Sequence, residues 1–335
     1  MRHALVTGAT GFIGRHLVRR LLSEGMAVKC LVRPQSRVEH LDGQDVAFVQ
    51  GDVSDASSLQ RAMQDVDVVY HLAGLTKSVS SRDLMELNHK GTRNVSLACS
   101  RLVSQPTLVV VSSLAAAGPS VGSQQRVEAD EVNPVSHYGH SKRAGELAAM
   151  EFATEVPTTI VRPPIVMGEY DLDVFQLFQM VRKFGFHLAP GFVNYHYSMI
   201  HADDLASALI LAADRGGRLT GNVEDNAGIY FAACEEVMTY SDLGRLIGDC
   251  VGRPHARMVH APMLMVWGLA LGCDLWSRIK KSPTLFNLDK AREAAAGAWA
   301  CSADKLRSHT GFEPAMSLEN RLRQTAEWYI QEKWL

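Results

Sequence analysis

A tyrosine and a lysine lie four residues apart in the stretch Ser136 to Arg143, SHYGHSKR. The next residues, AGELAAMEF, predict a helix, and residues i and i+4 lie on the same face of a helix. There the Lys142 ammonium would lower the pKa of the Tyr138 phenol, normally about 10, so that the phenol exchanges protons near neutrality. The alternative is that the two residues are ordinary neighbours on a half-exposed helix. The pair by itself does not distinguish a catalytic site from such a helix surface.

A glycine-rich turn near the beginning of the chain is a second candidate site. Thr7 to Gly14, TGATGFIG, follows an apolar run and precedes an amphipathic segment. In a strand–turn–helix unit, Gly8 permits the turn, Gly11 lets the backbone approach a pyrophosphate, and Gly14 lets helix and strand lie close together. Glycine triplets are common in turns, but this one begins a βαβ unit and therefore predicts dinucleotide binding.

The residues after the second apolar run bear on the choice of dinucleotide. Folds that prefer NAD usually place an acid there for the ribose 2′-hydroxyl. This chain has Arg33 there, with Arg37 close behind. Because a guanidinium can pair with a 2′-phosphate, we expect NADP, with NAD as the alternative if the arginines are merely solvated. Asp52, after the third run, is expected to accept a hydrogen bond from the adenine amino group.

The first 165 residues must position these groups, and they alternate apolar runs with amphipathic segments. The apolar runs are 4–7, 27–32, 46–50, 66–72, 107–111 and 158–161. The amphipathic segments are 12–23, 57–63, 83–101 and 138–154. Because the apolar runs are too uniform for half-exposed strands, they predict an α/β fold with a doubly wound, Rossmann-like parallel sheet.

The regularity fades after Pro163-Pro164, where turns separate helices expected near 203–213, 240–251 and 318–332. We therefore expect a dinucleotide-binding domain over 1–165 and a smaller, mixed substrate-binding cap over 166–335. A strand and helix at about 196–213 are expected to return to the first domain.

Composition limits the remaining possibilities. The chain of 335 residues is 47% hydrophobic and 21% charged, with a net charge of −2, which gives no electrostatic case for nucleic acid. Six scattered cysteines without a Cys-x-x-Cys pair argue against zinc and suit a reducing compartment. Together with the lack of a signal peptide before the first strand, this predicts a cytoplasmic protein.

Two further stretches have simple interpretations. His201-Ala202-Asp203-Asp204 lacks a third ligand at suitable spacing, so we expect Asp203 to cap a helix and expect no metal. The apolar segment 261–273 is too short to span a bilayer. It is interpreted as a buried or substrate-lining helix, with contact to a membrane surface as the alternative.

Eight motifs in order resemble the extended short-chain dehydrogenase/reductase family, which includes NAD(P)-dependent epimerases and dehydratases. They are TGATGFIG, GDVSD, HLAG, NHKGTRNV, VVVSSLAAAG, YGHSK, VRPPIVMG and SMIHADDLASA, and they cover residues 3 to about 213. SSLAAAGPS followed by YGHSKRAGE is most similar to the 3β-hydroxysteroid dehydrogenase and dihydroflavonol reductase branches.

The resemblance implies roles for the site residues and a homodimer. Tyr138 matches the general acid/base, and Lys142 matches the lysine that holds the ribose and stabilises the phenolate. Ser113, with Ser112 as the alternative, matches the hydroxyl that holds the substrate oxygen. Asn88 either supports the lysine or is a helix-surface residue. The expected cofactor contacts are Gly8, Thr10, Gly11, Phe12, Ile13, Gly14, Arg33, Arg37, Asp52, Val53, Leu72, Ala73, Gly74, Tyr138, Lys142, Pro163 and Ile165.

Two departures from the motifs of the family's subtypes narrow the choice of reaction and substrate. The Asp-Glu pair of sugar-nucleotide dehydratases is replaced by Leu114 and Ala115, and Tyr197 stands where many epimerases carry a diphosphate-binding arginine. The expected substrate-binding wall is rich in apolar and aromatic residues and has few partners for a phosphate. This composition favours an enzyme that oxidises an apolar alcohol or reduces an apolar ketone. A sugar-nucleotide epimerase and a non-catalytic NADP-binding sensor are the alternatives. The expected substrate contacts are Met167, Tyr170, Phe175 and Tyr197.

Overall fold

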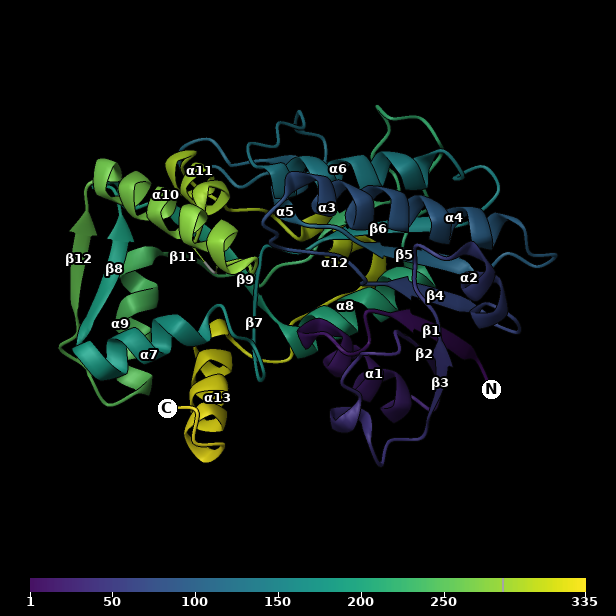
Figure 1. The fold of residues 1–335 in the computed structure, drawn as a ribbon, viewed down its shortest axis with the longest axis horizontal. Coiled ribbons are helices and arrows are strands. Elements are labelled where there is room, and N and C mark those ends of the chain that lie inside the picture. The colour runs from purple at the N-terminus through teal and green to yellow at the C-terminus, as the bar shows by residue number, and fades with distance from the viewer. Residues whose placement is uncertain (285) are drawn as a thin grey trace.

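A seven-stranded sheet forms the centre of the chain in a computed structural model that describes residues 1–284 and 286–335 (Figure 1). Its strand order is β3-β2-β1-β4-β5-β6-β10, and all neighbouring strands are parallel. The order reverses between β1 and β4, which is where doubly wound sheets bind dinucleotides. The strands are β1 (His3–Thr7), β2 (Ala27–Val32), β3 (Val46–Gln50), β4 (Val68–His71), β5 (Thr107–Val111), β6 (Thr158–Arg162) and β10 (Ile229–Phe231).

Helices cover both faces of this sheet (Figure 1). α1 (Phe12–Ser23) and α8 (Ala202–Arg215) pack together on one face. The other face carries α2 (Ala56–Ala62), α4 (Thr92–Ser100) and α6 (His137–Met150). Each face buries its own apolar cluster against the sheet. The predicted α/β fold with a doubly wound parallel sheet is therefore confirmed.

The residues after 165 contribute to both parts of the molecule. β10 adds a seventh strand to the central sheet, and α8 returns to it as expected. The strand of the expected 196–213 unit, β9 (His196–His201), instead joins a separate sheet of order β11-β9-β7. Its partners are β7 (Ile165–Met167) and β11 (Val237–Thr239), and a two-stranded sheet pairs β8 (Phe186–Pro190) with β12 (Arg257–Ala261).

The remaining helices surround these small sheets at the end of the molecule away from β3 (Figure 1). They are α7 (Phe175–Phe184), α9 (Tyr240–Cys250), α10 (Met263–Lys280), α11 (Leu288–Ala295) and α13 (Leu318–Gln331), whereas α12 (Asp304–Thr310) packs on α8 and β10 of the central sheet. α5 (Leu114–Ala117) follows β5, and a 3₁₀ turn, η1 (Glu39–Leu41), precedes β3. α10 rests on α11 through Val266, Ala270 and Ala291.

Two helices differ from the sequence prediction. The single helix expected over 83–101 is divided into α3 (Ser81–Leu84), a π-helical turn η2 (Met85–Gly91) and α4. Such π-turns often occur at functional sites, and this one contains Asn88. The apolar 261–273 segment begins α10, but the helix runs on to Lys280 and is largely exposed, so the prediction of a buried helix is wrong.

Candidate active site

The glycine-rich turn joins β1 to α1 where the strand order reverses. Gly8 has a φ of +73°, and its carbonyl accepts from the Gly11 amide at 3.0 Å. A Cβ on Gly14 would lie 2.2 Å from the Gly8 carbonyl oxygen, so glycine is required for this close approach. α1 begins at Phe12 without a side-chain cap, which leaves its first amides for an anion. The turn, with half-buried Thr10 and Ile13, therefore fits a pyrophosphate.

The residues expected near the adenosine lie after β2 and β3. Arg33 and Arg37 are exposed, and in the part of the chain that the structure describes neither forms an ion pair. One Asp52 carboxylate oxygen accepts from the Ser54 amide at 2.8 Å and from its hydroxyl at 2.7 Å, while Val53 is buried. Both arginines are therefore free of intramolecular ion pairs in the described residues, and their contact with a 2′-phosphate, like NADP itself, stays a prediction.

The segment after β4 contacts the glycine turn directly. A Cβ on Gly8 would lie 2.8 Å from the Ala73 nitrogen. The Thr7 hydroxyl is 2.8 Å from His71 Nδ1 and accepts from the Ala73 amide at 3.2 Å, while His71 Nε2 lies 3.1 Å from the Thr92 hydroxyl. Burial lowers the pKa of His71 to about 3. This histidine therefore stays neutral and connects two elements beside the cofactor turn.

Asn88 fixes the end of this segment. Its Oδ1 accepts from the Leu75 amide at 2.8 Å, and its Nδ2 donates to the Leu75 carbonyl at 2.8 Å and to the Ser141 hydroxyl at 2.9 Å. Asn88 is buried, so the alternative of a helix-surface asparagine is wrong. Asn88 thereby holds the segment after β4, which contains Leu72 and Gly74, against α6. Tyr138 and Lys142 lie on this helix.

The Ser113 hydroxyl lies beside the Tyr138 phenol and acts to lower its pKa. Ser113 is the N-cap of α5 at the end of β5, and Tyr138 lies in the first turn of α6. The neighbouring Ser112 hydroxyl is buried and donates to Glu146 at 2.6 Å, so Ser113 is the hydroxyl that meets the phenol. Burial raises the pKa of Tyr138, although Ser113 and Lys290 oppose the rise. The expected lowering of this pKa is therefore not seen in the protein alone.

Lys142 lies one helical turn after Tyr138 on α6. Its Nζ donates to the Val111 carbonyl at the end of β5 at 2.6 Å. A Cβ on Gly74 would lie 3.7 Å from this Nζ, so the lysine borders an expected cofactor contact. Burial lowers the pKa of Lys142 to about 8, with Glu146 acting in the opposite direction. Pro163, another expected contact, accepts from the Leu114 amide at 2.8 Å, and Ile165 begins β7.

A buried ion pair holds α6 on the sheet. Arg162 of β6 donates through Nε and a terminal nitrogen to the two Glu146 oxygens, each at 2.7 Å. Ser112 and Arg143 also bind this carboxylate, Arg143 at 3.0 Å. These donors belong to β6, to the residue that follows β5, or to α6 itself. The part of α6 after Lys142 is therefore fixed by the central sheet.

The start of α6 is instead held by α11, some 150 residues later, and no local sequence pattern indicates this contact. The Asp289 carboxylate accepts from the amides of His137 and Tyr138, both at 2.9 Å. The Ser136 hydroxyl, the N-cap of α6, donates to Glu293 at 2.7 Å. Lys290 Nζ lies 5.9 Å from the centre of the Tyr138 ring. α11 thus supplies a second cation beside the phenol.

A cleft of ≈ 310 Å³ opens at this junction. Its walls are the segment 76–81, the start of α6 with Tyr138, and the facing helices α10 and α11. Lys77 on one wall pairs with Asp173 at 2.8 Å. Tyr197 packs on Tyr240 with ring centres 5.2 Å apart, and the charge of Lys290 acts on Tyr240.

The other three expected substrate contacts have different surroundings. Met167 is fully buried, and Phe175 packs on Tyr329 with ring centres 4.9 Å apart. Tyr170 is partly exposed beneath the Arg15 guanidinium, 4.6 Å from its ring centre. Within residues 1–284 and 286–335, none of the four lines the cleft beside Tyr138. The substrate contacts stay a prediction.

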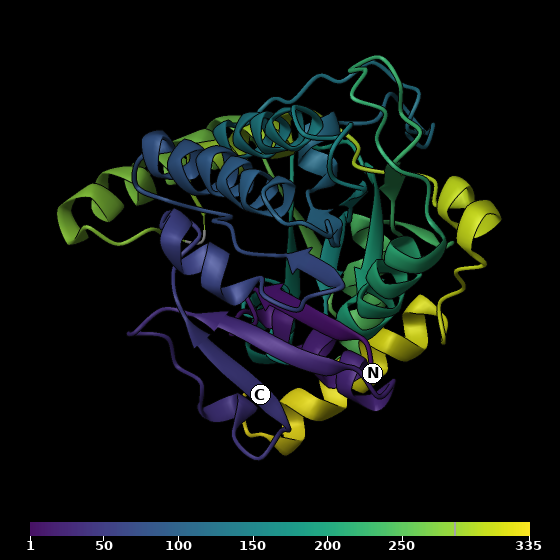
Figure 2. The same cartoon turned by 90° about the vertical axis from the view of Figure 1, so that its right-hand side faces the viewer.

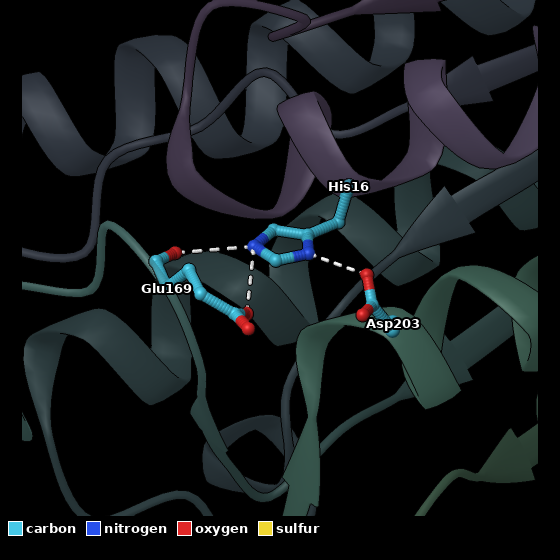
Figure 3. A group of neighbouring side chains, drawn as sticks. All are labelled: His16, Glu169 and Asp203. Atoms are coloured by element: carbon cyan, nitrogen blue, oxygen red, sulfur yellow. Dashed lines mark hydrogen bonds and ion pairs between the residues drawn. The ribbon is translucent and has the colours of Figure 1, made fainter. Parts of the chain in front are cut away.

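Three titratable groups meet between α1, α8 and the loop after β7 (Figure 3). His16 Nδ1 lies 2.6 Å from Asp203, and its Nε2 lies 3.1 Å from the Glu169 carbonyl oxygen. The sequence near Asp203 offers no third group at suitable spacing, but His16 and Glu169 approach it from distant parts of the chain. Arg19 binds the same Asp203 oxygen at 2.7 Å, which opposes a second cation. The cap of α8 is His201 rather than Asp203, because the His201 ring accepts from the Asp203 amide at 3.2 Å.

Comparison with known proteins agrees with this geometry. The model of the NAD dependent epimerase/dehydratase family matches residues 4–223. The chain is 29% identical over 331 residues to the ceramide reductase of Caulobacter vibrioides, covering 98% of this chain and 95% of that protein. It is 27% identical over 359 residues to 3 beta-hydroxysteroid dehydrogenase type 7 of Mus musculus, covering 97% and 94% of the two chains.

Among solved structures, the UDP-glucose 4-epimerase of Thermotoga maritima superposes with a TM-score of 0.76 at 22% identity, over 99% of each chain. This likeness shows the fold. The family match spans the glycine turn, the Ser113–Tyr138 pair and Lys142. The chain is therefore an enzyme of the extended short-chain dehydrogenase/reductase type and belongs to the NAD-dependent epimerase/dehydratase family.

Proposed function

We propose that this enzyme is an NADP-dependent oxidoreductase that interconverts an apolar alcohol and its ketone at Ser113, Tyr138 and Lys142. The observation that carries the proposal is that the Ser113 hydroxyl adjoins the Tyr138 phenol, which lies at the wall of an open cleft. A purely structural tyrosine has no need of an adjacent hydroxyl, a half-buried lysine on the same helix face and access to a cleft.

In ketone reduction, the substrate oxygen lies between the Ser113 hydroxyl and the Tyr138 phenol. A nicotinamide dinucleotide, when bound, supplies the hydride. The phenol donates its proton to the oxygen as negative charge develops, and the serine donates a hydrogen bond to the same atom. The Lys142 ammonium stabilises the resulting phenolate and holds the ribose hydroxyls. Alcohol oxidation runs through the same groups in reverse.

An apolar substrate is supported by the residues that replace nucleotide-binding groups. Leu114 and Ala115 are buried and carry no group that could protonate or deprotonate a substrate. Tyr197 packs on Tyr240 and offers no charge to a diphosphate. Two of the relatives are named for ceramide and for a steroid, both of them lipids. A lipid-like ketone therefore suits this site better than a sugar nucleotide.

The other cofactor and assembly proposals rest on fewer contacts. NADP is favoured over NAD because Arg33 and Arg37 are exposed where an acid would bind the ribose. Arg33→Ala should reduce the preference by about 1.5–3 kcal/mol, as for a hydrogen bond to a charged group. A cytoplasmic location is supported by six free cysteines.

We propose a homodimer through the segments 83–101 and 138–154, as the family commonly forms, and the five apolar residues that could supply its contact divide into two groups. Leu84, Val95 and Met150 are buried within the chain. Leu147 is exposed and Leu87 is partly buried, so these two stay available for a partner. Light scattering at micromolar concentration tests the homodimer.

Cofactor consumption tests the proposed reaction. We expect NADPH absorbance to fall in proportion to alcohol formed when long-chain or polycyclic ketones are supplied. The epimerase alternative predicts conversion of a UDP-sugar with no net change in NADPH. The sensor alternative predicts NADPH binding without turnover of either substrate class. Tyr138→Phe, assayed beside the wild type, shows that any activity comes from this site.

A further inference from the structure

α10 has an outward face made of apolar side chains. Its inward face is buried by Val266 and Ala270. Six large apolar side chains on the opposite face are exposed: Leu264, Met265, Leu269, Leu271, Leu275 and Ile279. A helix at the surface of a globular protein normally turns polar residues to water. Packing within the chain therefore does not explain the outward face.

The apolar surface continues onto the loop that follows β8. Phe192 and Val193 are 73% and 58% exposed. The Gly191 amide donates to the Ala261 carbonyl at 2.8 Å, which places this loop beside the beginning of α10. We refer to Phe192, Val193 and the six exposed α10 side chains as the α10 patch. Contiguous exposed apolar surface of this kind marks an interaction site.

Positive charge gathers at the far end of the patch. Residues 262–283 contain Arg278, Lys280 and Lys281 but one acid, Asp274. Asp274 is mostly buried and pairs with Arg278 at 3.0 Å. Trp276 is half-exposed beneath the Lys280 ammonium, which lies 4.9 Å from its ring centre. Tryptophan and lysine at the rim of an apolar face suit the boundary between anionic headgroups and acyl chains.

The length and position of α10 suit a helix that lies in the plane of a membrane surface. Its 18 residues extend about 27 Å at 1.5 Å per residue. In residues 1–284 and 286–335, no helix has both the length and the apolarity to cross a bilayer. Figure 2 shows the green helix α10 projecting from the rest of the molecule. Its outward face is thus free to meet a flat surface.

The other side of α10 borders the catalytic cleft. Asp274 and Arg278 line the cleft together with Tyr138 and with Lys290 of α11. A molecule embedded at the level of the α10 patch would therefore reach the phenol along the side of the same helix. This continuity favours a lipid surface over a second protein, because a protein seated on α10 would cover the approach to the cleft.

We infer that the α10 patch docks on the surface of a bilayer containing anionic lipid, and that the cleft receives its substrate from that bilayer. The second half of this inference rests on the proposed function, whereas the docking depends on α10 and the 191–193 loop alone. The six apolar side chains enter the acyl boundary, and Lys280 and Lys281 meet the headgroups.

Vesicle flotation tests the docking. The full chain is mixed with phosphatidylcholine vesicles prepared with and without phosphatidylglycerol. We expect flotation with the anionic vesicles and about a tenfold loss for Leu271→Asp/Leu275→Asp, because charges replace two leucines that would enter the acyl boundary. Lys280→Glu/Lys281→Glu should lose about tenfold on anionic vesicles and little on neutral ones, as expected for charges at the surface. Val103→Asp/Val121→Asp, which changes exposed valines elsewhere, is the matched control.

Several results would overturn the docking. The first is that the wild type does not float with vesicles of either lipid composition. The second is that the Val103/Val121 control loses as much flotation as the α10 variants. The third is that the chain forms a dimer that only the α10 variants dissociate. The last result would assign the patch to a second copy of the chain. Tyr138→Phe should float like the wild type, so failure of the proposed chemistry is distinguishable from failure of the docking. Equal melting temperatures of all variants show that folding is unaffected.

Discussion

The central sheet and α11 hold the same catalytic helix by different means. On the sheet side, the fully buried Glu146 binds Arg162 through two 2.7 Å contacts. On the other side, Asp289 binds the amides at the start of α6, and Ser136 donates to Glu293. The first contact is closed to water, and the second lies at the wall of an open cleft.

This difference has consequences for function. A buried charge that loses its partner is costly, whereas a partly exposed pair contributes little. The sheet side therefore keeps Tyr138 and Lys142 in place whatever binds in the cleft. The α11 side is where substrate meets the protein, and it connects through α10 to the α10 patch. We expect substitutions on the two sides to separate stability from catalysis.

The largest effect should come from the phenol that both sides position. Tyr138→Phe removes the transferable proton and nothing else of the ring, so turnover should fall by about 10²–10⁴-fold. NADPH affinity, measured by fluorescence titration, should change little. Tyr240→Phe, which alters a neighbouring phenol also influenced by Lys290, is the control and should keep most of the activity. Ordinary turnover by Tyr138→Phe on a proven substrate would end the catalytic interpretation.

Breaking the sheet-side contact should mainly cost stability. Arg162→Met leaves the Glu146 carboxylate buried without its main partner, and we expect a loss of about 3–5 kcal/mol in the free energy of unfolding. Urea denaturation measures this loss. Arg143→Met removes a more exposed donor to the same carboxylate and should cost much less. Equal losses for the two variants would contradict the view that burial makes the sheet side rigid.

The cation on the α11 side should influence the phenol rather than the fold. Burial raises the pKa of Tyr138 and Lys290 opposes the rise, so Lys290→Met should raise that pKa further. Alcohol oxidation requires the phenolate, and its rate should therefore begin to rise at a higher pH than in the wild type. The pH dependence of kcat/KM for oxidation measures the change.

Lys142→Met is the comparison for this effect. Its ammonium binds the Val111 carbonyl and borders Gly74, so its loss should weaken NADPH binding as well as turnover. Lys290→Met should leave NADPH affinity unchanged. A pH profile that moves in neither variant would show that neither ammonium acts on the phenol during catalysis.

The sheet side could be predicted from the sequence because its signals are local. Buried parallel strands appear as uniform apolar runs, and the bounds of 27–32, 46–50 and 107–111 agree with β2, β3 and β5. The turn from Gly8 to Gly14 could be recognised because its glycines are consecutive parts of one strand–turn–helix unit. Ser113 could be selected over Ser112 only through the family resemblance, since the Glu146 contact of Ser112 is not visible in the sequence.

The cap side could not be predicted in the same way. Asp289 and Lys290 reach Tyr138 across about 150 residues, and a charged short helix gives no indication of its partner. Apolar content predicted that 261–273 forms a helix, but periodicity does not show whether neighbouring elements cover it. His16 and Glu169 likewise approach Asp203 only because α1 packs on α8. Long-range packing, rather than propensity, decides these contacts.

The smallest effect should follow from weakening the cap-side contact. Asp289→Asn keeps one oxygen acceptor for the start of α6 but removes the charge that favours a helix N-terminus. We expect a loss of about 0.5–1 kcal/mol in the free energy of unfolding and a several-fold fall in kcat, because the first turn carries Tyr138. Glu319→Gln, an exposed acid in the first turn of α13, is the control for helix-dipole effects and should leave kcat unchanged. Asp289→Asn could instead lose as much stability as Arg162→Met. The two sides would then hold α6 equally firmly, and the proposed division between a rigid sheet side and a substrate-facing cap side would fail.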